Sequence, residues 1–402
     1  MSKIYITAAK RTPIASFLGS LKNTDITELG ALVIKQVVED SQLSLDDVNE
    51  VIMGHVLSAG VGQGPARQAS VRAGIPVSTV AYSLNMLCGS GMKSVINGYK
   101  DIKGGFAQAV VAGGMEAMSS APMLLPGNVR SGNKMGNMNV LDHMVFDGLT
   151  DAFDGIHMGI TAENIAEKYN IDRQTQDEFA YQSQQKAIAA VDAGAFKDEI
   201  VPVEVKVRRN TVVFDQDEYP NRTTNLEKLS NLRAAFKKDG SVTAGNASGI
   251  NDAASAVMLV SDKLVAEKNL TPLVEIIGFG QGGVDPKVMG LGPTPAIKMA
   301  LEQAQLTLDD MEVIELNEAF AAQSLGVVHE LVETFGVDKD ALLAKTNILG
   351  GAIALGHPIG VSGNRIIVTL VHLMKKHNYK YGLASLCIGG GMGTAVVLKN
   401  VE

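Results

Sequence analysis

The chain has 402 residues, of which 46% are hydrophobic and 19% charged, so it is long enough for two or three globular domains. Its formal net charge of −8 argues against a general role in binding nucleic acid or anionic membranes, but it does not exclude a local basic pocket. No uncharged apolar run approaches about 18 residues, so we expect no transmembrane helix. The two cysteines are too few for a disulfide framework.

Neither end of the chain reads as a targeting signal. The start, MSKIYITAAKRTP, lacks the apolar core of a secretory signal, and it is not an Arg/Ser-rich transit peptide. The end, LKNVE, is not a peroxisomal tail. We therefore expect a cytoplasmic protein, because a reducing compartment suits free, reactive thiols.

Along the chain, short β-branched runs alternate with segments of helical periodicity, which is typical of a layered α/β fold. The expected strands, in chain order, are IYITAA, EVIMGHV, AVVAGG, EVIEL and TAVVLK. The expected helices are 25–40, 161–169, 174–193, 295–304 and 320–335.

The chain also repeats itself. Three blocks recur in the same order, and in the first of them eight of fifteen positions are identical. The paired blocks are 34–48 with 297–311, 90–96 with 362–368 and, more loosely, 109–118 with 385–394. The repetition predicts two copies of one α/β unit.

Between the copies, at about 120–250, the texture changes. An Asn-, Gly- and Met-rich segment comes first and a charged stretch, 204–240, comes last. We expect this insert to form a lid over an active site, although a charged stretch with interspersed acids also fits a solvated face. The cations of the stretch are Lys206, Arg208, Arg209, Arg222, Lys228, Arg233, Lys237 and Lys238.

Three residues on glycine-dense turns carry the strongest chemical signal. They are Cys88 in NMLCGSGMKS, His357 in GGAIALGHPIG and Cys387 in LCIGGGMG. Two thiols and an imidazole on such turns suggest a nucleophile, a base and oxyanion-stabilising amides in one cleft. Taken singly, each also fits a buried structural residue. Cys88 precedes a predicted helix, whose free N–H groups favour a thiolate.

Further polar motifs surround these turns. Asn317 in LNEAFAAQ ends an apolar strand, where it either binds a water or substrate oxygen or caps the next helix. The run SVTAGNASGINDAASA offers amides and hydroxyls that could line a narrow channel. The chain has no phosphate-binding P-loop and no dinucleotide-binding glycine motif. Zinc ligation by the two Cys and one His has no supporting spacing.

These motifs, together with NEAFAAQ and VTAGNASGIND, resemble those of the thiolases over essentially the whole chain. HMGITAEN at 157–164 further resembles the biosynthetic branch, the acetyl-CoA acetyltransferases. The resemblance implies a duplicated, five-layered α-β-α-β-α fold with an inserted loop domain. We expect the first half to comprise 1–120 plus 251–271, the inserted domain 121–250 and the second half 272–402.

The resemblance also implies the chemistry, a Claisen condensation of two acetyl-CoA to acetoacetyl-CoA plus CoA, and its reverse. Cys88 is then the acylated nucleophile, His357 its activator and Cys387 the base for the α-proton. The N–H groups of Cys88 and Gly389 would hold the tetrahedral oxyanion. His357 and a water on Asn317 would hold the enolate oxygen. No permanently bound cofactor is implied, and CoA thioesters are the substrates.

The resemblance assigns contacts to CoA as well. Ser248 matches a serine that binds the pantetheine arm, and His157, Met158, Leu149, Met289 and Phe320 match the pocket lining. Many relatives have Arg directly after the residue matching Pro220, whereas this chain has Asn221 and then Arg222. The phosphate contact is therefore shifted, weakened or supplied by Arg222.

Four alternatives compete with this interpretation, and the presence of both cysteines argues against the first two. A ketoacyl synthase of the same fold would lack the second cysteine, and a non-enzymatic CoA-binding module would have lost one of the two. A zinc protein would be revealed by metal analysis. A broader-range 3-ketoacyl-CoA thiolase of fatty-acid degradation would share all these motifs.

For the assembly we expect a homotetramer, a dimer of dimers joined through residues 126–144, because that segment is too apolar to lie freely in water. A segment that folds back on its own subunit is the alternative.

Overall fold

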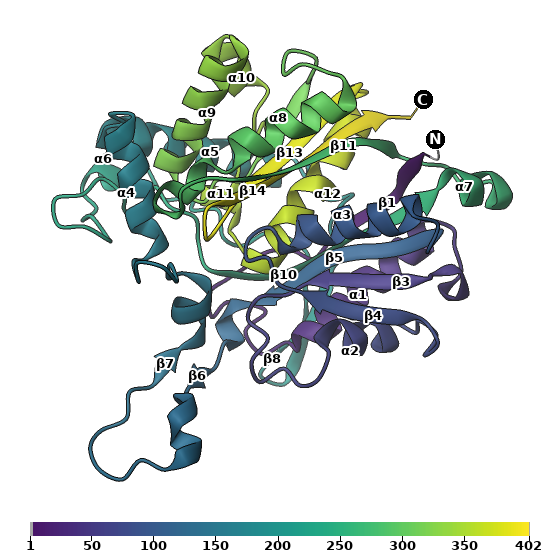
Figure 1. The fold of residues 1–402 in the computed structure, drawn as a ribbon, viewed down its shortest axis with the longest axis horizontal. Coiled ribbons are helices and arrows are strands. Elements are labelled where there is room, and N and C mark those ends of the chain that lie inside the picture. Colours follow the sequence, from purple (N-terminus) through teal and green to yellow (C-terminus); the bar gives the residue numbers. More distant parts are fainter. Residues whose placement is uncertain (1–2, 402) are drawn as a thin grey trace.

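The computed structural model of the chain describes residues 3–401, so Met1, Ser2 and Glu402 of the terminal segments lie outside it. Helices and strands stack in five layers, which Figure 1 shows from α8 and α9 at the top to α1 and α2 below. Two helices from opposite halves of the chain, α3 and α12, make the middle layer. The layer helices are α1 Ile26–Asp40, α2 Pro65–Arg72, α3 Ser90–Lys103, α8 Pro293–Ala304, α9 Ala321–Phe335 and α12 Ile359–His377.

The strands form one continuous sheet in the order β12-β13-β14-β11-β1-β10-β5-β3-β4, with the short β2 beside β10. Only two residue pairs, Tyr5 with Glu275 and Ile6 with Val274, join the two halves at β1 and β11. The strand bounds are β1 Ile4–Arg11, β2 Ala15–Ser16, β3 Glu50–Gly54, β4 Val80–Leu84, β5 Ala109–Ala117, β10 Asn251–Ser261, β11 Val274–Gly283, β12 Val313–Leu316, β13 Tyr381–Ile388 and β14 Met392–Asn400.

The two halves have the same topology. The run β3-β5-β10-β1 corresponds to β12-β13-β14-β11, and in each run the first pair is parallel and the other two are antiparallel. The predicted duplication therefore holds at the level of strand order. One alignment was wrong: β5 begins at Ala109 and β13 at Tyr381, so block 109–118 corresponds to a segment that begins at 381 and not at 385. The loose similarity between the glycines of the two segments had shifted the alignment toward the C-terminus.

Three apolar cores separate the layers. One lies between the first-half strands and α1, one around α3 and α12, and one between the second-half strands and α8 and α9. In the middle layer the backbones touch, since a Cβ added to Gly91 on α3 would lie 2.8 Å from the backbone nitrogen of Asn364 and 3.0 Å from the carbonyl oxygen of Gly360, both on α12. Small residues thus let the N-termini of α3 and α12 approach each other, and the turns before them meet.

The insert contributes several small elements. Strands β6 Met123–Leu124 and β7 Leu141–Asp142 pair at the base of an arm that projects from the body, at the lower left of Figure 1. Beyond the arm lie α4 Met158–Lys168, α5 Arg173–Asp192, α6 Leu226–Ser230 and the hairpin β8 Val203–Val207 with β9 Asn210–Phe214. The chain then returns to the first half, where β10 lies between β1 and β5 and is followed by α7 Asp262–Lys268. Two further short helices are α10 Lys339–Ala344 and α11 Ala352–Leu355.

All five expected helices are present, with shifts of up to three residues at their starts. The largest shift is at α4, which begins at Met158 and not at 161 because His157 caps it: its Nδ1 accepts the N–H of Gly159 at 3.0 Å. Histidine is an unusual cap, so the sequence pattern missed this start. Among residues 3–401, no helix has the length and apolarity that crossing a membrane requires.

Candidate active site

Cys88 lies in the turn between β4 and α3, two residues before the helix begins. Leu87 is in the left-handed region at φ 49°, and the hydroxyl of Ser90 fixes this turn by donating to Leu87 O at 2.6 Å and accepting from Met86 N at 2.8 Å. A non-glycine residue held at positive φ points to an imposed conformation. The turn therefore presents the thiol in one direction.

Burial raises the pKa of the Cys88 thiol to about 11, and hydrogen bonds from the backbone N–H groups of Gly389 and of Cys88 itself oppose that shift. Cys88 is thus a thiol at neutral pH and needs a base to become a nucleophile. The same two N–H groups converge on the sulfur, so they are placed to bind an oxyanion formed there.

His357 lies in the turn between α11 and α12 and is buried. Its backbone N–H donates to Asn251 Oδ1 at 2.9 Å. The preceding Gly356 has φ 104°, and a Cβ there would lie 2.4 Å from the Asn251 side chain, so only glycine fits. Asn251 and Gly356 together fix the backbone position from which the His357 imidazole projects.

Ser362 sets the tautomer of His357. The serine hydroxyl donates to Pro358 O at 3.0 Å, so at 2.6 Å it accepts from the imidazole Nδ1–H. Nε2 is left with a free lone pair and has no partner among the described residues. Burial, with a contribution from Arg365, lowers the pKa of His357 to about 4, so the ring is neutral. His357 is therefore a base with its lone pair available.

Cys387 is fully buried near the end of β13, and Gly389 follows in the turn to β14. Burial and the neighbouring Cys88 raise the pKa of Cys387 far above that of a free thiol. Cys387 packs in one apolar cluster with Met158, Met289 and Phe320. A thiol there ionises only when its proton passes to a strong acceptor, such as a leaving thiolate.

Asn317 follows β12, and its backbone N–H donates to Ser385 O at 3.0 Å. Its side-chain nitrogen lies 3.5 Å from His357 Nδ1, and its Oδ1 has no partner among residues 3–401. A buried amide oxygen without a partner calls for a water or a ligand atom. The helix-capping alternative does not hold, because Phe320 occupies the N-cap of α9.

An apolar cavity of about 200 Å³ joins these turns. Cys88, His357 and Gly389 line it, whereas Asn317 and Cys387 are not among its lining residues, although Cys387 packs with the lining residues Met158, Met289 and Phe320. All the predicted pantetheine and acyl contacts line it as well: Leu149, His157, Met158, Ser248, Met289 and Phe320. The insert supplies Leu149, His157, Met158 and Ser248, so it covers the site, whereas its arm points away from the body.

His157 is one of the polar residues that the insert contributes to the cavity lining. Because its Nδ1 accepts from Gly159, its Nε2 carries the proton, and its ring stacks on Phe236 with centroids 4.6 Å apart. Burial lowers the pKa of His157, so the ring is neutral. Together with Ser248, it gives the apolar cavity polar groups that could orient an amide-containing chain.

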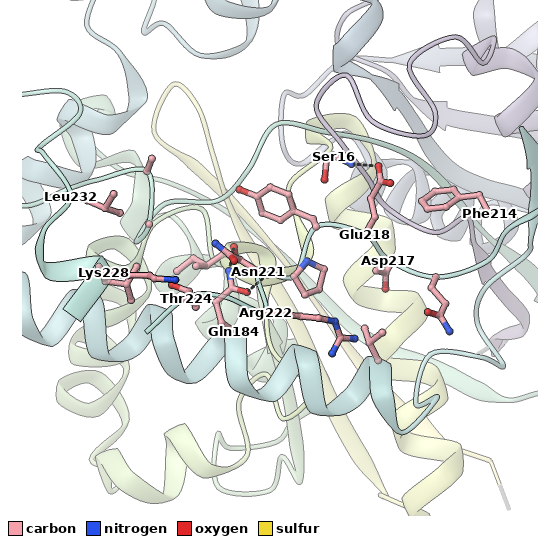
Figure 2. Close-up of a pocket in the computed structure, with 18 of the residues that line it drawn as sticks. Ser16, Gln184, Phe214, Asp217, Glu218, Asn221, Arg222, Thr224, Lys228 and Leu232 are labelled. Atoms are coloured by element: carbon pink, nitrogen blue, oxygen red, sulfur yellow. Dashed lines mark hydrogen bonds between the residues drawn. The ribbon is translucent and has the colours of Figure 1, made fainter. Parts of the chain in front are cut away.

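Arg222 lies elsewhere, at a polar cavity of about 1000 Å³ that Figure 2 shows. Its guanidinium forms a two-bonded ion pair with Asp192 on α5, at 2.6 and 3.0 Å. Both side chains are exposed, so the pair is weak and either partner is free to exchange it for another ion. Asn221 also lines the cavity, and its Oδ1 accepts the N–H and hydroxyl of Thr223.

Some contributors were missed by the sequence reasoning. Ser362 and Asn251 orient His357, and Phe236, Ile359 and Met118 line the cavity. Ser362 belongs to the repeated block 362–368 and Asn251 to the small polar run, so both were noticed without a role. Their function depends on contacts across 5 and 106 positions of the chain, which local patterns do not record. Of the described residues, no group of three or more His, Cys, Asp or Glu is arranged to hold a metal ion.

Comparison with known proteins gives the same family over the whole chain. The model of the thiolase N-terminal domain matches residues 4–263 and that of the thiolase C-terminal domain residues 270–400. An acetyl-CoA acetyltransferase of Chromobacterium violaceum is 52% identical over 398 residues, covering 99% of each chain. One of Escherichia coli is 50% identical over 402 residues, covering 100% of each.

Solved structures agree. The acetyl-CoA acetyltransferase of Bacillus anthracis has a TM-score of 0.95 at 43% identity and covers 100% of this chain and 99% of its own. Human mitochondrial 3-ketoacyl-CoA thiolase in complex with CoA has a TM-score of 0.93 at 43% identity, covering 100% and 98%. These matches confirm the predicted fold, and with the cavity that joins the Cys88, His357 and Gly389 turns they lead to one conclusion: the chain belongs to the thiolase family of acyltransferases.

Proposed function

We propose that this protein is an acetyl-CoA C-acetyltransferase, which condenses two acetyl-CoA to acetoacetyl-CoA plus CoA and catalyses the reverse thiolysis through an acetyl-Cys88 intermediate. The relatives of about 50% identity that carry this name support it. A broader-range 3-ketoacyl-CoA thiolase is the second candidate, because the human enzyme of that name is as similar in sequence, at 43%, as the Bacillus anthracis acetyltransferase.

In the first half-reaction, His357 Nε2 takes the proton of the Cys88 thiol while the sulfur attacks the acetyl-CoA carbonyl carbon. The N–H groups of Cys88 and Gly389 receive the oxyanion. Collapse breaks the bond to CoA sulfur, and the leaving thiolate takes its proton from Cys387. The products are acetyl-Cys88, free CoA, a thiolate at Cys387 and an imidazolium at His357. Opposite charges form together in a buried site, where they stabilise each other.

In the second half-reaction, the Cys387 thiolate removes a proton from the methyl group of a second acetyl-CoA. The enolate oxygen accepts from the His357 Nε2–H and from a water on Asn317, which accounts for the free Oδ1. The enolate carbon attacks the acetyl-Cys88 carbonyl carbon. Collapse releases acetoacetyl-CoA and a Cys88 thiolate, which recovers its proton from His357, so all groups return to their starting state.

One observation carries this proposal: Cys88, His357 and Gly389, from opposite halves of the chain, line one apolar cavity. The test is acylation. Labelled acetyl-CoA should attach its label to the Cys88 peptide, and Cys88→Ala should lose turnover in both directions. A label on Cys387 with Cys88 free would reverse the assignment.

Substrate range decides between the two candidates. Thiolysis of acetoacetyl-CoA measured beside a medium-chain 3-ketoacyl-CoA should favour the four-carbon substrate by at least an order of magnitude in kcat/KM, because the apolar cavity is only about 200 Å³. Equal rates would establish the broader-range enzyme.

For CoA we propose that the pantetheine arm passes His157 and Ser248, and that its phosphates lie in the polar cavity with Arg222 and Lys228 at the wall. The departure at Asn221 then transfers the phosphate contact to Arg222. To contact a phosphate, the Arg222 guanidinium must exchange its pairing with Asp192.

We further propose a cytoplasmic homotetramer, a dimer of dimers, with the domain division given from the sequence. The free cysteines suit a reducing compartment. The arm exposes large apolar side chains, including Met135 at 93% and Met123 at 65%, which favours burial against another subunit.

A further inference from the structure

Helix α5 of the insert carries four buried polar residues, Gln176, Asp177, Ser183 and Gln184. Ser183 and Gln184 lie between the buried Ala180 and Ala187. The helix is pressed onto the turn that leads to His357, since a Cβ on Gly350 would lie 2.7 Å from Ser183 O. Buried polar side chains in such close packing are kept by specific partners.

Gln184 is bonded at both ends of its amide. Its Oε1 accepts the backbone N–H of Asn221 at 2.9 Å, and its Nε2 donates to Ile353 O at 3.2 Å. The first partner, Asn221, lies beside Arg222 in the wall of the polar cavity, and Figure 2 shows Gln184 and Asn221 next to each other. The other lies in α11, which ends two residues before His357.

Ser183 secures the same turn from the other side. Its hydroxyl donates to Glu318 Oε2 at 2.6 Å and accepts from Gly351 N–H at 3.0 Å. Glu318 directly follows Asn317, and its Oε2 also accepts the N–H of Ile353 at 3.3 Å. The segment before His357 and the end of β12 that bears Asn317 are therefore tied to one point on α5.

We propose that Gln184 is a positioning residue that couples occupation of the polar cavity to the orientation of the His357 turn. The inference rests on the proposed function, in which the nucleotide end of CoA occupies this cavity. A nucleotide held at Asn221 and Arg222 fixes the Asn221 backbone, and through Gln184 it fixes Ile353 and the turn beyond. Remote binding energy is thereby spent on orienting the base, which appears in kcat and not in KM.

The test compares two thioesters with the same reacting arm, acetoacetyl-CoA and acetoacetyl-pantetheine, which lacks the nucleotide. The unaltered enzyme should thiolyse the CoA ester with a higher kcat. Gln184→Ala should lower kcat for the CoA ester about tenfold, the effect of one net hydrogen bond, and leave kcat for the pantetheine ester within about twofold. Gln184→Met, which fills the same space without an amide, should have the same effect as Gln184→Ala. It controls for collapse of the cavity that the alanine would leave. Gln185→Ala, at an exposed neighbour on the same helix, should change neither.

Three results would overturn the coupling. If the Gln184 variants lower kcat equally for both esters, the residue is only structural. If they raise KM for the CoA ester without changing kcat, it only contributes to binding. If the unaltered enzyme has the same kcat for both esters, the coupling is wrong but the proposed function stands. If it turns over neither ester, the proposed function itself is wrong.

Discussion

Cys88 and Cys387 lie in the same candidate site but have different proposed roles, nucleophile and base. Their surroundings differ in how well they stabilise a negative charge. Cys88 meets two N–H groups that stabilise negative charge, whereas Cys387 sits in an apolar cluster with Met158 and Phe320. Charge is therefore tolerated at Cys88 and disfavoured at Cys387. A thiolate in the second environment is a strong base, as abstraction of a proton from carbon requires.

Replacing Cys387 separates the two half-reactions. Cys387→Ser should still acetylate Cys88, but exchange of the acetyl methyl protons with solvent deuterium should fall 10²–10⁴-fold, because a hydroxyl is a poor base there. Mass spectrometry of the acyl-enzyme and NMR of the methyl group measure the two steps. Normal condensation by this variant would remove Cys387 from its proposed role.

Buried histidines make the protein sensitive to acid. Burial, helped by the nearby His143, lowers the pKa of His55 from 6.5 to about 4. The unfolded chain then takes up a proton near pH 6.5 that the folded chain refuses until about pH 4. The stability contributed, up to about 3 kcal/mol, is complete above pH 6.5 and lost as the pH falls towards 4.

His55→Gln should therefore flatten the pH dependence of unfolding. Between pH 6 and 5 the slope of the free energy of unfolding should fall by up to about 1.4 kcal/mol per pH unit, the value for one proton. Urea titrations at several pH values measure it. Identical slopes for the unaltered protein and His55→Gln would contradict the expectation.

At the scale of elements, the sequence predicted what depends on local pattern. Five strands, five helices, the duplication and the glycine turns have a signature within a few residues, whereas α12 and the strands β4, β10, β11 and β13 were not among the expected elements. The burial of four polar side chains on α5, Gln176, Asp177, Ser183 and Gln184, has no such signature. Each has a partner 37 to 169 positions away, so only the folded chain shows why they are buried.

The same limit holds for the site. Cys88, His357, Gly389 and the cavity lining could be picked from motifs and from the family resemblance, and the structure gathers them around one cavity. Their catalytic roles stay predictions. Ser362 and Asn251, which fix the tautomer and direction of the imidazole, required the three-dimensional arrangement.

The turn before α12 offers a direct test of this positioning. Gly356→Ala would place a methyl group 2.4 Å from Asn251 at a φ of 104°, so the asparagine must move and release the His357 N–H. We expect about 1–3 kcal/mol less stability and about a hundredfold lower kcat.

A matched control exists at the end of α9. Gly336 also has positive φ, 69°, but a Cβ there meets nothing within 4 Å. Gly336→Ala should cost only about 1–2 kcal/mol of backbone strain and keep full activity. Thermal unfolding and thiolysis rates decide, and similar activity losses in both variants would show that the Asn251 contact is not what matters.

At the scale of the whole molecule, the arm is the part least explained by a single subunit. Light scattering at micromolar concentration should give a mass near four chains, and shortening residues 128–138 should give dimers that keep thiolase activity. The physical reason is that the exposed methionines of the arm gain from burial only against another subunit. A mass near two chains for the unaltered protein would defeat the tetramer.

The position of β10 has a consequence for how the chain is made. This strand lies between β1 and β5, yet it begins at Asn251, about 130 residues after β5 ends at Ala117. On a ribosome that adds 5–20 residues each second, β5 waits roughly 7–26 s with an open edge until β10 begins to emerge, and β1, which ends at Arg11, waits longer. Open strand edges invite pairing with other chains. The nascent protein therefore passes through a vulnerable interval whose length the insert sets, and chaperones are expected to act in that interval.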